Sequence, residues 1–251
     1  MWDKPQLMTA VSDLLLVSAA AVLFGALVVW AAHLPVFPLR EVIVMQELRE
    51  VRRSEVEQSL SDRLRGNFFS INLDGVRRSL EQLPWIRHVD IRRRWPSSLE
   101  VSIEEHVPAA FWGQSTGQLV NSHGEVFAAE MNASPTAPIP LLVGPSGWAP
   151  EMLTYYREAA EMLKPLGRVP QELNVSPRLA MQLRLDDGMI VELGRQQAKA
   201  PLRERLERFV EYYPSVLTAA LQRPKVVDMR YPNGFALRVA AAPAIENKGK
   251  P

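Results

Sequence analysis

The sequence predicts an α+β protein that is held in a membrane by a single N-terminal helix. Three observations support this fold class: an uncharged run over residues 14–32, a strand–helix–helix–strand–strand pattern over residues 38–107, and a mostly antiparallel series of short strands with flanking helices over residues 108–242. Helices gathered on one side of a sheet are the arrangement expected of the α+β class. Residues 1–13 and 243–251 are then tails, and we expect the second tail to be disordered.

The uncharged run reads LLLVSAAAVLFGALVVWAA. As a helix it spans roughly 28 Å, close to the hydrocarbon thickness of a bilayer. A buried core helix would carry a polar stripe, and a cleaved signal peptide has a shorter apolar core. We therefore predict a retained anchor, with a signal peptide cleaved after Ala31 as the alternative. Charge does not settle sidedness, because only Lys4 precedes the run and several arginines follow it.

Composition excludes several kinds of chemistry. The chain has no cysteine, so neither a disulfide framework nor a catalytic thiolate is available. Its formal net charge of +1 gives no general attraction to nucleic acid. The chain beyond the apolar run is long enough for two small domains.

The first domain is predicted from helical and alternating patterns. A strand at 39–45 precedes a helix that starts at a capping box, with Ser54 as N-cap and Glu57 at N3, and ends near Gly66. A second helix follows Asn72 and is stopped by Pro84. Strands at 86–94 and 99–106 complete a three-stranded sheet with two helices on one face.

The second domain is predicted to be mostly β. We expect strands at 109–113 and 141–143, a hairpin at 118–128, and a second hairpin at 179–194 that turns at Asp-Asp-Gly. Helices are predicted at 150–163 and from Leu202 through Tyr213. A last hairpin follows this second helix.

The last hairpin lies within VVDMRYPNGFALRV, residues 226–239. One face of its first strand carries Val227, Met229 and Tyr231, and Gly234 suits a left-handed turn position. After the turn, Phe235, Leu237 and Val239 alternate with smaller or charged residues, as in a half-buried strand. A strand that closes a chain is often outermost in its sheet. Its edge is then either blunted, by Arg238 and a covering loop, or open to a partner strand.

Patterns that would indicate chemistry are weak. Gly113–Gly117 matches G-x-S-x-G, but a nucleophile elbow needs a helix after the turn, and a strand is predicted there. The four histidines lack metal-ligand spacing. The basic run Arg92–Trp95 is best explained by arginines that pair with Glu100, Glu104 and Glu105 across a hairpin. We therefore expect no enzyme, catalytic residue, metal, cofactor, small-molecule substrate or nucleic-acid ligand.

The βααββ order resembles a POTRA domain, a module that docks polypeptides. This domain follows the predicted anchor, and its run LPWIRHVDIRRRWPSSLEVSIEEHVP, residues 83–108, resembles the FtsQ/DivIB family of cell division proteins. Segments 119–127, 174–194, 202–210 and 227–238 resemble the same family in the same order. The resemblance covers nearly the whole chain.

The resemblance implies a bacterial cell division scaffold in the inner membrane, at the division septum. Its N-terminus would be cytoplasmic and its two domains periplasmic. The partners implied are FtsB and FtsL as the FtsB–FtsL complex, with FtsK and FtsW as further divisome candidates. FtsB would add a strand to the terminal edge. The partner-binding residues carried over are Arg230, Tyr231, Asn233, Gly234, Phe235, Leu237 and Val239.

Two rivals remain open. A POTRA-containing factor for polypeptide transport or outer-membrane assembly would usually carry tandem POTRA repeats and a long barrel, and neither pattern occurs here. A secreted periplasmic enzyme would require cleavage near Ala32.

Overall fold

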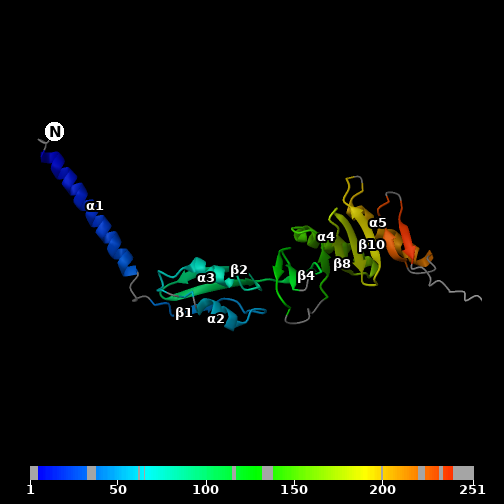
Figure 1. Ribbon diagram of the computed structural model, residues 1–251, viewed down its shortest axis with the longest axis horizontal. Helices are drawn as coiled ribbons and strands as arrows, with labels where there is room; N and C mark the ends of the chain where they lie inside the picture. The colour runs from blue at the N-terminus through cyan, green and yellow to red at the C-terminus, as the bar shows by residue number, and fades with distance from the viewer. Residues whose placement is uncertain are drawn as a thin grey trace, which may run out of the picture. The chain divides into compact units, whose positions relative to one another are not determined.

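The computed structural model of the chain describes residues 5–32, 38–61, 63–64, 66–114, 117–131, 138–198, 200–219, 224–231 and 234–239 (Figure 1). The predicted tail at 243–251 lies outside these residues. The chain forms two compact units, Met1–His106 and Val107–Pro251. Each unit is described by itself below.

The first unit begins with the long helix α1, Pro5–Ala32. Its segment Thr9–Trp30 is long and apolar enough to cross a membrane. Large apolar side chains along this segment are exposed, which is the opposite of a buried core helix. The helix starts nine residues before the predicted span, because residues 5–13 continue the same helical path.

The rest of the first unit is a three-stranded sheet with two helices. The elements are β1 (Glu41–Val44), α2 (Arg53–Ser61), α3 (Leu73–Leu80), β2 (Ile86–Arg94) and β3 (Ser98–Glu105). Strand β3 is central, with β1 parallel and β2 antiparallel to it. The predicted βααββ order is confirmed.

The core of this domain lies between the helices and the sheet. The alternation in β3 places Leu99, Val101 and Ile103 inward, as predicted, and they are almost fully buried. The helices supply Val56, Leu60, Val76 and Leu80 to the same core. Burial of these side chains is the main force that holds the helices on the sheet.

The helix starts differ in how well they were predicted. Asn72 caps α3, because its side-chain oxygen accepts a 2.9 Å hydrogen bond from the Gly75 N–H. The capping box at Ser54 is wrong, since α2 already begins at Arg53 and the backbone carbonyl of Arg52 accepts the first bonds. A polar residue one position inside a helix resembles a cap in sequence.

The predicted cross-strand ion pairs are present in part. Arg92 contacts Glu100 at 2.5 Å, and Arg87 contacts Glu104 at 2.9 Å. Glu105 instead accepts backbone N–H groups from residues 49–51, which lie in the loop after β1. The glutamates therefore both neutralise the arginine-rich strand and order the neighbouring loop.

The second unit is built on one nine-stranded sheet with two α-helices. In spatial order the strands are β12 (Ala236–Val239), β11 (Pro224–Asp228), β10 (Ile190–Arg195), β9 (Ala180–Leu185), β8 (Pro170–Val175), β7 (Leu141–Val143), β4 (Pro108–Trp112), β5 (Gln118–Asn121) and β6 (Val126–Ala128). The helices are α4 (Ala149–Leu163) and α5 (Leu202–Ala219), and a short 3-10 turn, η1 (Lys164–Leu166), follows α4. Most pairs are antiparallel, as predicted, but β10–β11, β7–β8 and β4–β7 are parallel. Strand β8 was not predicted.

A row of cross-strand partners runs along the sheet and forms the centre of the core. It consists of Trp112, Leu142, Leu173, Leu183, Val191 and Val227, each nine per cent exposed or less. Helices α4 and α5 pack against each other and against this part of the sheet. The row ends at Val227 of β11, the neighbour of the outer strand β12.

Candidate partner-binding edge

Strand β12 is the outermost strand at one end of the nine-stranded sheet, as the sequence predicted. It pairs with β11 through Asp228↔Ala236, Val227↔Leu237 and Val226↔Arg238. Among the described residues no strand lies on its other side. The strand therefore presents one open edge.

The register shows which backbone groups point outward. The Met229 N–H donates to the Glu192 carbonyl of β10 at 2.9 Å, so Val227 and Met229 direct their backbone groups toward β10. Because successive residues of a strand alternate sides, Val226 and Asp228 pair with β12. The backbone N–H and C=O groups of their partners Arg238 and Ala236 therefore point toward β11. Those of Leu237, which lies between them, point away from β11.

The side chains of β12 add an apolar strip to this open edge. Leu237 extends the buried row beyond Val227, yet it is 41% exposed, and Val239 on the same face is 48% exposed. The prediction of a half-buried strand is wrong here, since all four residues of β12 are exposed. Phe235 is the last covered residue of the strip, and its ring lies 6.5 Å from that of Tyr212.

An ion cluster supports the other face of the edge. Arg230 donates to both oxygens of Asp228, at 2.8 and 2.5 Å, and approaches Glu192 at 3.3 Å. Hydrogen bonds from the Arg230 guanidinium hold the pKa of Asp228 below its usual value, and Asp228 in turn raises the pKa of Arg230. The guanidinium fork of Arg230 is thus already engaged within the domain.

The remaining predicted site residues lie in the connection between β11 and β12. Tyr231 is not part of the strand, because β11 ends at Asp228; its side chain is 55% exposed. Gly234 has open space around its Cα but does not adopt the left-handed conformation that was predicted. Asn233 lies outside the described residues.

Sequence reasoning missed residues that support the edge from α5. Arg208 donates to the Tyr231 carbonyl at 3.1 Å, and Tyr212 covers Phe235 while remaining 45% exposed. Buried Arg205 donates to the carbonyls of Leu193 and Arg195 at the end of β10. The only signal in the sequence was a run of arginines and aromatics on one helix.

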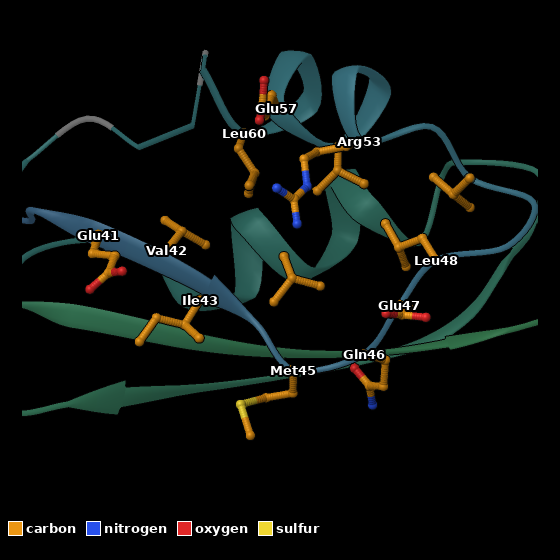
Figure 2. Close-up of a pocket in the computed structure, with 13 residues that line it drawn as sticks. Glu41, Val42, Ile43, Met45, Gln46, Glu47, Leu48, Arg53, Glu57 and Leu60 are labelled. Atoms are coloured by element: carbon orange, nitrogen blue, oxygen red, sulfur yellow. The ribbon is translucent and has the colours of Figure 1, made fainter.

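A groove in the first unit also combines a strand edge with apolar side chains. It has a volume of about 690 Å³ and lies between the outer strand β1 and helix α2 (Figure 2). Leu60 and Leu48 lie along it, and the Arg53 side chain reaches from α2 toward β1. Like β12, β1 is an outer strand with accessible apolar neighbours.

The G-x-S-x-G match connects two strands. Gly113 follows β4 and Gly117 precedes β5, and these strands are antiparallel partners. A strand-to-helix elbow is therefore not formed. Ser115 itself lies outside the described residues.

The described residues combine one helix long and apolar enough to cross a membrane, a βααββ domain, and a mixed-sheet domain whose outer strand β12 has one open edge. The sequence model described as "POTRA domain, FtsQ-type" matches residues 37–106, and "Cell division protein FtsQ/DivIB, C-terminal" matches residues 110–230. The chain belongs to the FtsQ family of cell division proteins. The second match ends at Arg230, before β12.

Curated relatives extend over most of the chain. The cell division protein FtsQ of Nitrosospira multiformis is 39% identical over 243 residues, which cover 95% of this chain and 99% of that protein. FtsQ of Burkholderia pseudomallei is 37% identical, covering 96% and 95%. FtsQ of Escherichia coli is 31% identical, covering 87% and 79%.

Proposed function

We propose that this protein is a cell division scaffold that captures an extended segment of FtsB on strand β12. The observation that carries the proposal is an outer strand whose Leu237 backbone points outward beside an exposed apolar strip. Backbone pairing would supply affinity, and pockets for alternate side chains would supply specificity. FtsL would be held through its complex with FtsB.

The side chains have distinct roles in this proposal. Leu237 and Val239, with Phe235 behind them, would be covered by alternate apolar side chains of the added strand. Tyr231 would contact the partner directly, since its side chain is exposed and its backbone is held by Arg208. Arg230 would act mainly by fixing Asp228 and the end of β11. Asn233 and Gly234 would lie where the partner passes the connection.

The protein would work by binding and not by catalysis. A single helix would hold it in the inner membrane, with the N-terminus in the cytoplasm and both domains in the periplasm at the septum. FtsK and FtsW are further candidate partners, for which no contact residues are assigned. A reporter that is active only in the periplasm, fused after Pro251, should be active; activity of a cytoplasm-specific reporter at that position would contradict this orientation.

The strand-addition test compares two substitutions at one position. Leu237→Ala removes the side chain and keeps the N–H, so we expect roughly fivefold weaker binding of a periplasmic FtsB segment. Leu237→Pro also removes the outward N–H, which should weaken binding by roughly a further fivefold to tenfold. Calorimetry with the full chain in detergent would measure both affinities.

A stability measurement and a control variant make this test decisive. The thermal unfolding midpoint should change little in either variant, because the bonds to β11 use Ala236 and Arg238. Arg238→Pro is the matched control, since it removes an inward N–H and should loosen β12 itself. Equal affinities for the Ala and Pro variants, with β12 still folded, would rule out strand addition.

Tyr231→Ala should weaken the binding of FtsB without changing the thermal unfolding midpoint.

A further inference from the structure

One end of the POTRA domain is tied to the membrane-spanning helix by a short length of chain. The Arg40 N–H donates to the Ser97 carbonyl at 2.9 Å, and Arg94 pairs with Ser98, so the β2–β3 turn lies beside the start of β1. Seven residues lie between Ala32 and Arg40, so the two Cα atoms can be at most about 28 Å apart. We call this the tethered end: residues 40–41, 63–71 (as far as described) and 92–100.

The tethered end exposes two large aromatic side chains. Trp95 at the tip of the turn is 80% exposed, and Phe69 is 46% exposed. Arg93 fixes the Phe69 loop at this end, because its guanidinium donates to the carbonyls of Phe68, Phe69 and Ile71 at 2.8–3.2 Å. The buried ring of Phe68 supports Phe69 edge-on, with ring centroids 5.1 Å apart. Two large apolar rings are therefore exposed to solvent at this end, and the loop that carries Phe69 is fixed by hydrogen bonds.

Charge is unevenly distributed along this domain. Residues 38–106 contain equal numbers of arginines and acidic residues. The described part of the tethered end nevertheless carries Arg40, Arg63, Arg92, Arg93 and Arg94 against only Glu41 and Glu100. Glu100 is paired with Arg92. Within the described residues, Arg40, Arg63 and Arg94 form no ion pair, although Arg94 lies close enough to Glu100 to help lower the pKa of that carboxyl.

The opposite end of the sheet differs. It carries Glu47, Glu50, Glu104 and Glu105 together with Arg49, Arg52, Arg53 and Arg87, so it has no basic excess; Arg87 pairs with Glu104, and Glu105 orders the loop at residues 49–51. Large exposed rings beside free arginines occur at the end that the chain keeps near the bilayer. Tryptophan favours the membrane interface, and arginine favours phosphate through paired N–H groups.

We propose that the tethered end rests on the membrane surface, with Trp95 and Phe69 in the interface and Arg40, Arg63 and Arg94 against anionic phospholipid headgroups. This contact would set the tilt of the POTRA domain over the bilayer. It rests on α1 being a retained anchor and is independent of strand capture at β12. Its failure would therefore leave the proposed capture of FtsB untouched.

The test uses the absence of cysteine in the chain. Ser97→Cys in the full-length protein gives a single label site beside Trp95, and Glu47→Cys gives a matched site at the opposite end. Each is labelled with a fluorophore and reconstituted in nanodiscs that contain phosphatidylglycerol and nitroxide-labelled lipid. We expect strong quenching at position 97 and little at position 47.

Two changes should remove the quenching. Replacing the anionic lipid by phosphatidylcholine, or adding Trp95→Ser with Arg94→Glu, should reduce the quenching at position 97 by about fivefold, since each arginine near an anionic surface contributes appreciably to the attraction. Thermal unfolding should be unchanged, because both side chains are exposed. Circular dichroism of the label-free double variant controls for folding.

Several outcomes would overturn the proposal. Equal quenching at positions 97 and 47, or quenching at 97 that persists in the double variant, would show that the contact does not depend on this surface. No quenching at 97 in anionic discs, followed by a change in the fluorescence when the FtsB–FtsL complex is added, would assign the tethered end to a protein partner instead.

Discussion

The two ends of the nine-stranded sheet are edges of different kinds. At one end, β6 belongs to a hairpin that is fixed by its own turn: buried Asn121 accepts the N–H groups of His123 and Glu125 at 2.9 Å. At the other end, β12 returns through residues 229–235 and is held from α5 by side chains such as Tyr212. A buried side chain within the hairpin's own turn fixes the first edge, whereas a half-exposed ring from a distant helix supports the second.

This difference bears on which edge can accept a partner. Strand β6 has three residues, one of them the buried Phe127, which keeps it short and uninviting to another strand. Strand β12 exposes all four residues and continues the apolar row of the core. A partner strand would therefore bury more apolar surface at β12 than at β6, and β12 is the edge expected to bind one.

The largest effect should come from a glycine in the turn of the β5–β6 hairpin. Gly124 has a φ of 87°, and a Cβ there would lie 2.6 Å from the Pro150 Cα, so backbone would have to move. Gly124→Ala should lower the free energy of unfolding by about 3 kcal/mol, from strain plus overpacking. Gly194 also has a positive φ, but a Cβ there would meet side chains and not backbone: it would lie 2.8 Å from the Arg230 Cγ and 3.3 Å from the Arg205 guanidinium.

Gly194→Ala should therefore lower the free energy of unfolding by only about 1 kcal/mol. Urea unfolding of the full chain in detergent, followed by tryptophan fluorescence, would measure both variants. Equal costs would mean that the two ends of the sheet are held equally rigidly, and the contrast between them would be lost.

The next effect concerns binding at matched positions on the two edges. The Asn121 N–H of β5 donates to the Glu125 carbonyl, so Glu125 faces β5. Because successive residues of a strand alternate sides, the N–H of Val126 points away from β5, just as the N–H of Leu237 points away from β11. The two side chains are similarly exposed, at 43% and 41%. Val126→Pro should leave FtsB affinity unchanged, whereas Leu237→Pro should reduce it by roughly 25-fold to 50-fold.

Binding by calorimetry or surface plasmon resonance would compare these two variants. A loss of affinity in Val126→Pro that equals the loss in Leu237→Pro would place the partner elsewhere or indicate a global defect. Hydrogen exchange at β5 and β11 would separate these two explanations.

A smaller effect should appear in the pH dependence of stability. The pKa of Asp228 is lowered in the folded protein by hydrogen bonds from Arg230. Its unfolded pKa is about 3.9, so the pair stabilises the fold above that pH and loses its effect as the pH falls through the lower folded pKa. The pair should contribute about 1 kcal/mol at neutral pH, because Arg230 is half exposed and therefore screened.

Asp228→Asn should therefore reduce stability at pH 7 and flatten the stability profile below about pH 4. Arg230→Gln should flatten it in the same way, and the double variant should add little to either single change. Thermal unfolding between neutral and acid pH would show this. An unchanged acid slope in Asp228→Asn would mean that the ion pair does not stabilise this edge.

Sequence patterns predicted the order of elements well where local chemistry determines them. The alternation of Leu99, Val101 and Ile103 gave a correct strand, and the second helix follows Asn72 as predicted. Strand β8 was missed because PQELNV begins with proline and mixes polar residues, and its pairing depends on distant strands on both sides. Non-local pairing leaves only a weak pattern in a short segment.

The candidate site was predicted in position but not in detail. Alternation continued the strand to Tyr231, although Arg230 turns back to Asp228 and the strand ends there. The exposure of Leu237 could not be predicted, because its pattern is that of a core residue, and its cover depends on how far α5 reaches. Tyr212 was overlooked for the same reason, since its role comes from contact with Phe235 across the fold.

The smallest effect should come from that contact. Tyr212→Ala removes a ring that is 45% exposed and lies against Phe235, so the free energy of unfolding should change by about 0.5 kcal/mol. FtsB affinity should fall by about threefold, because Phe235 at the end of the apolar strip loses its support. Tyr213→Phe, at the buried neighbouring position, keeps the packing and should leave affinity unchanged. A stability loss in Tyr212→Ala as large as that of Gly124→Ala would show that α5 holds β12 rigidly, and the edge would then be as fixed as β6.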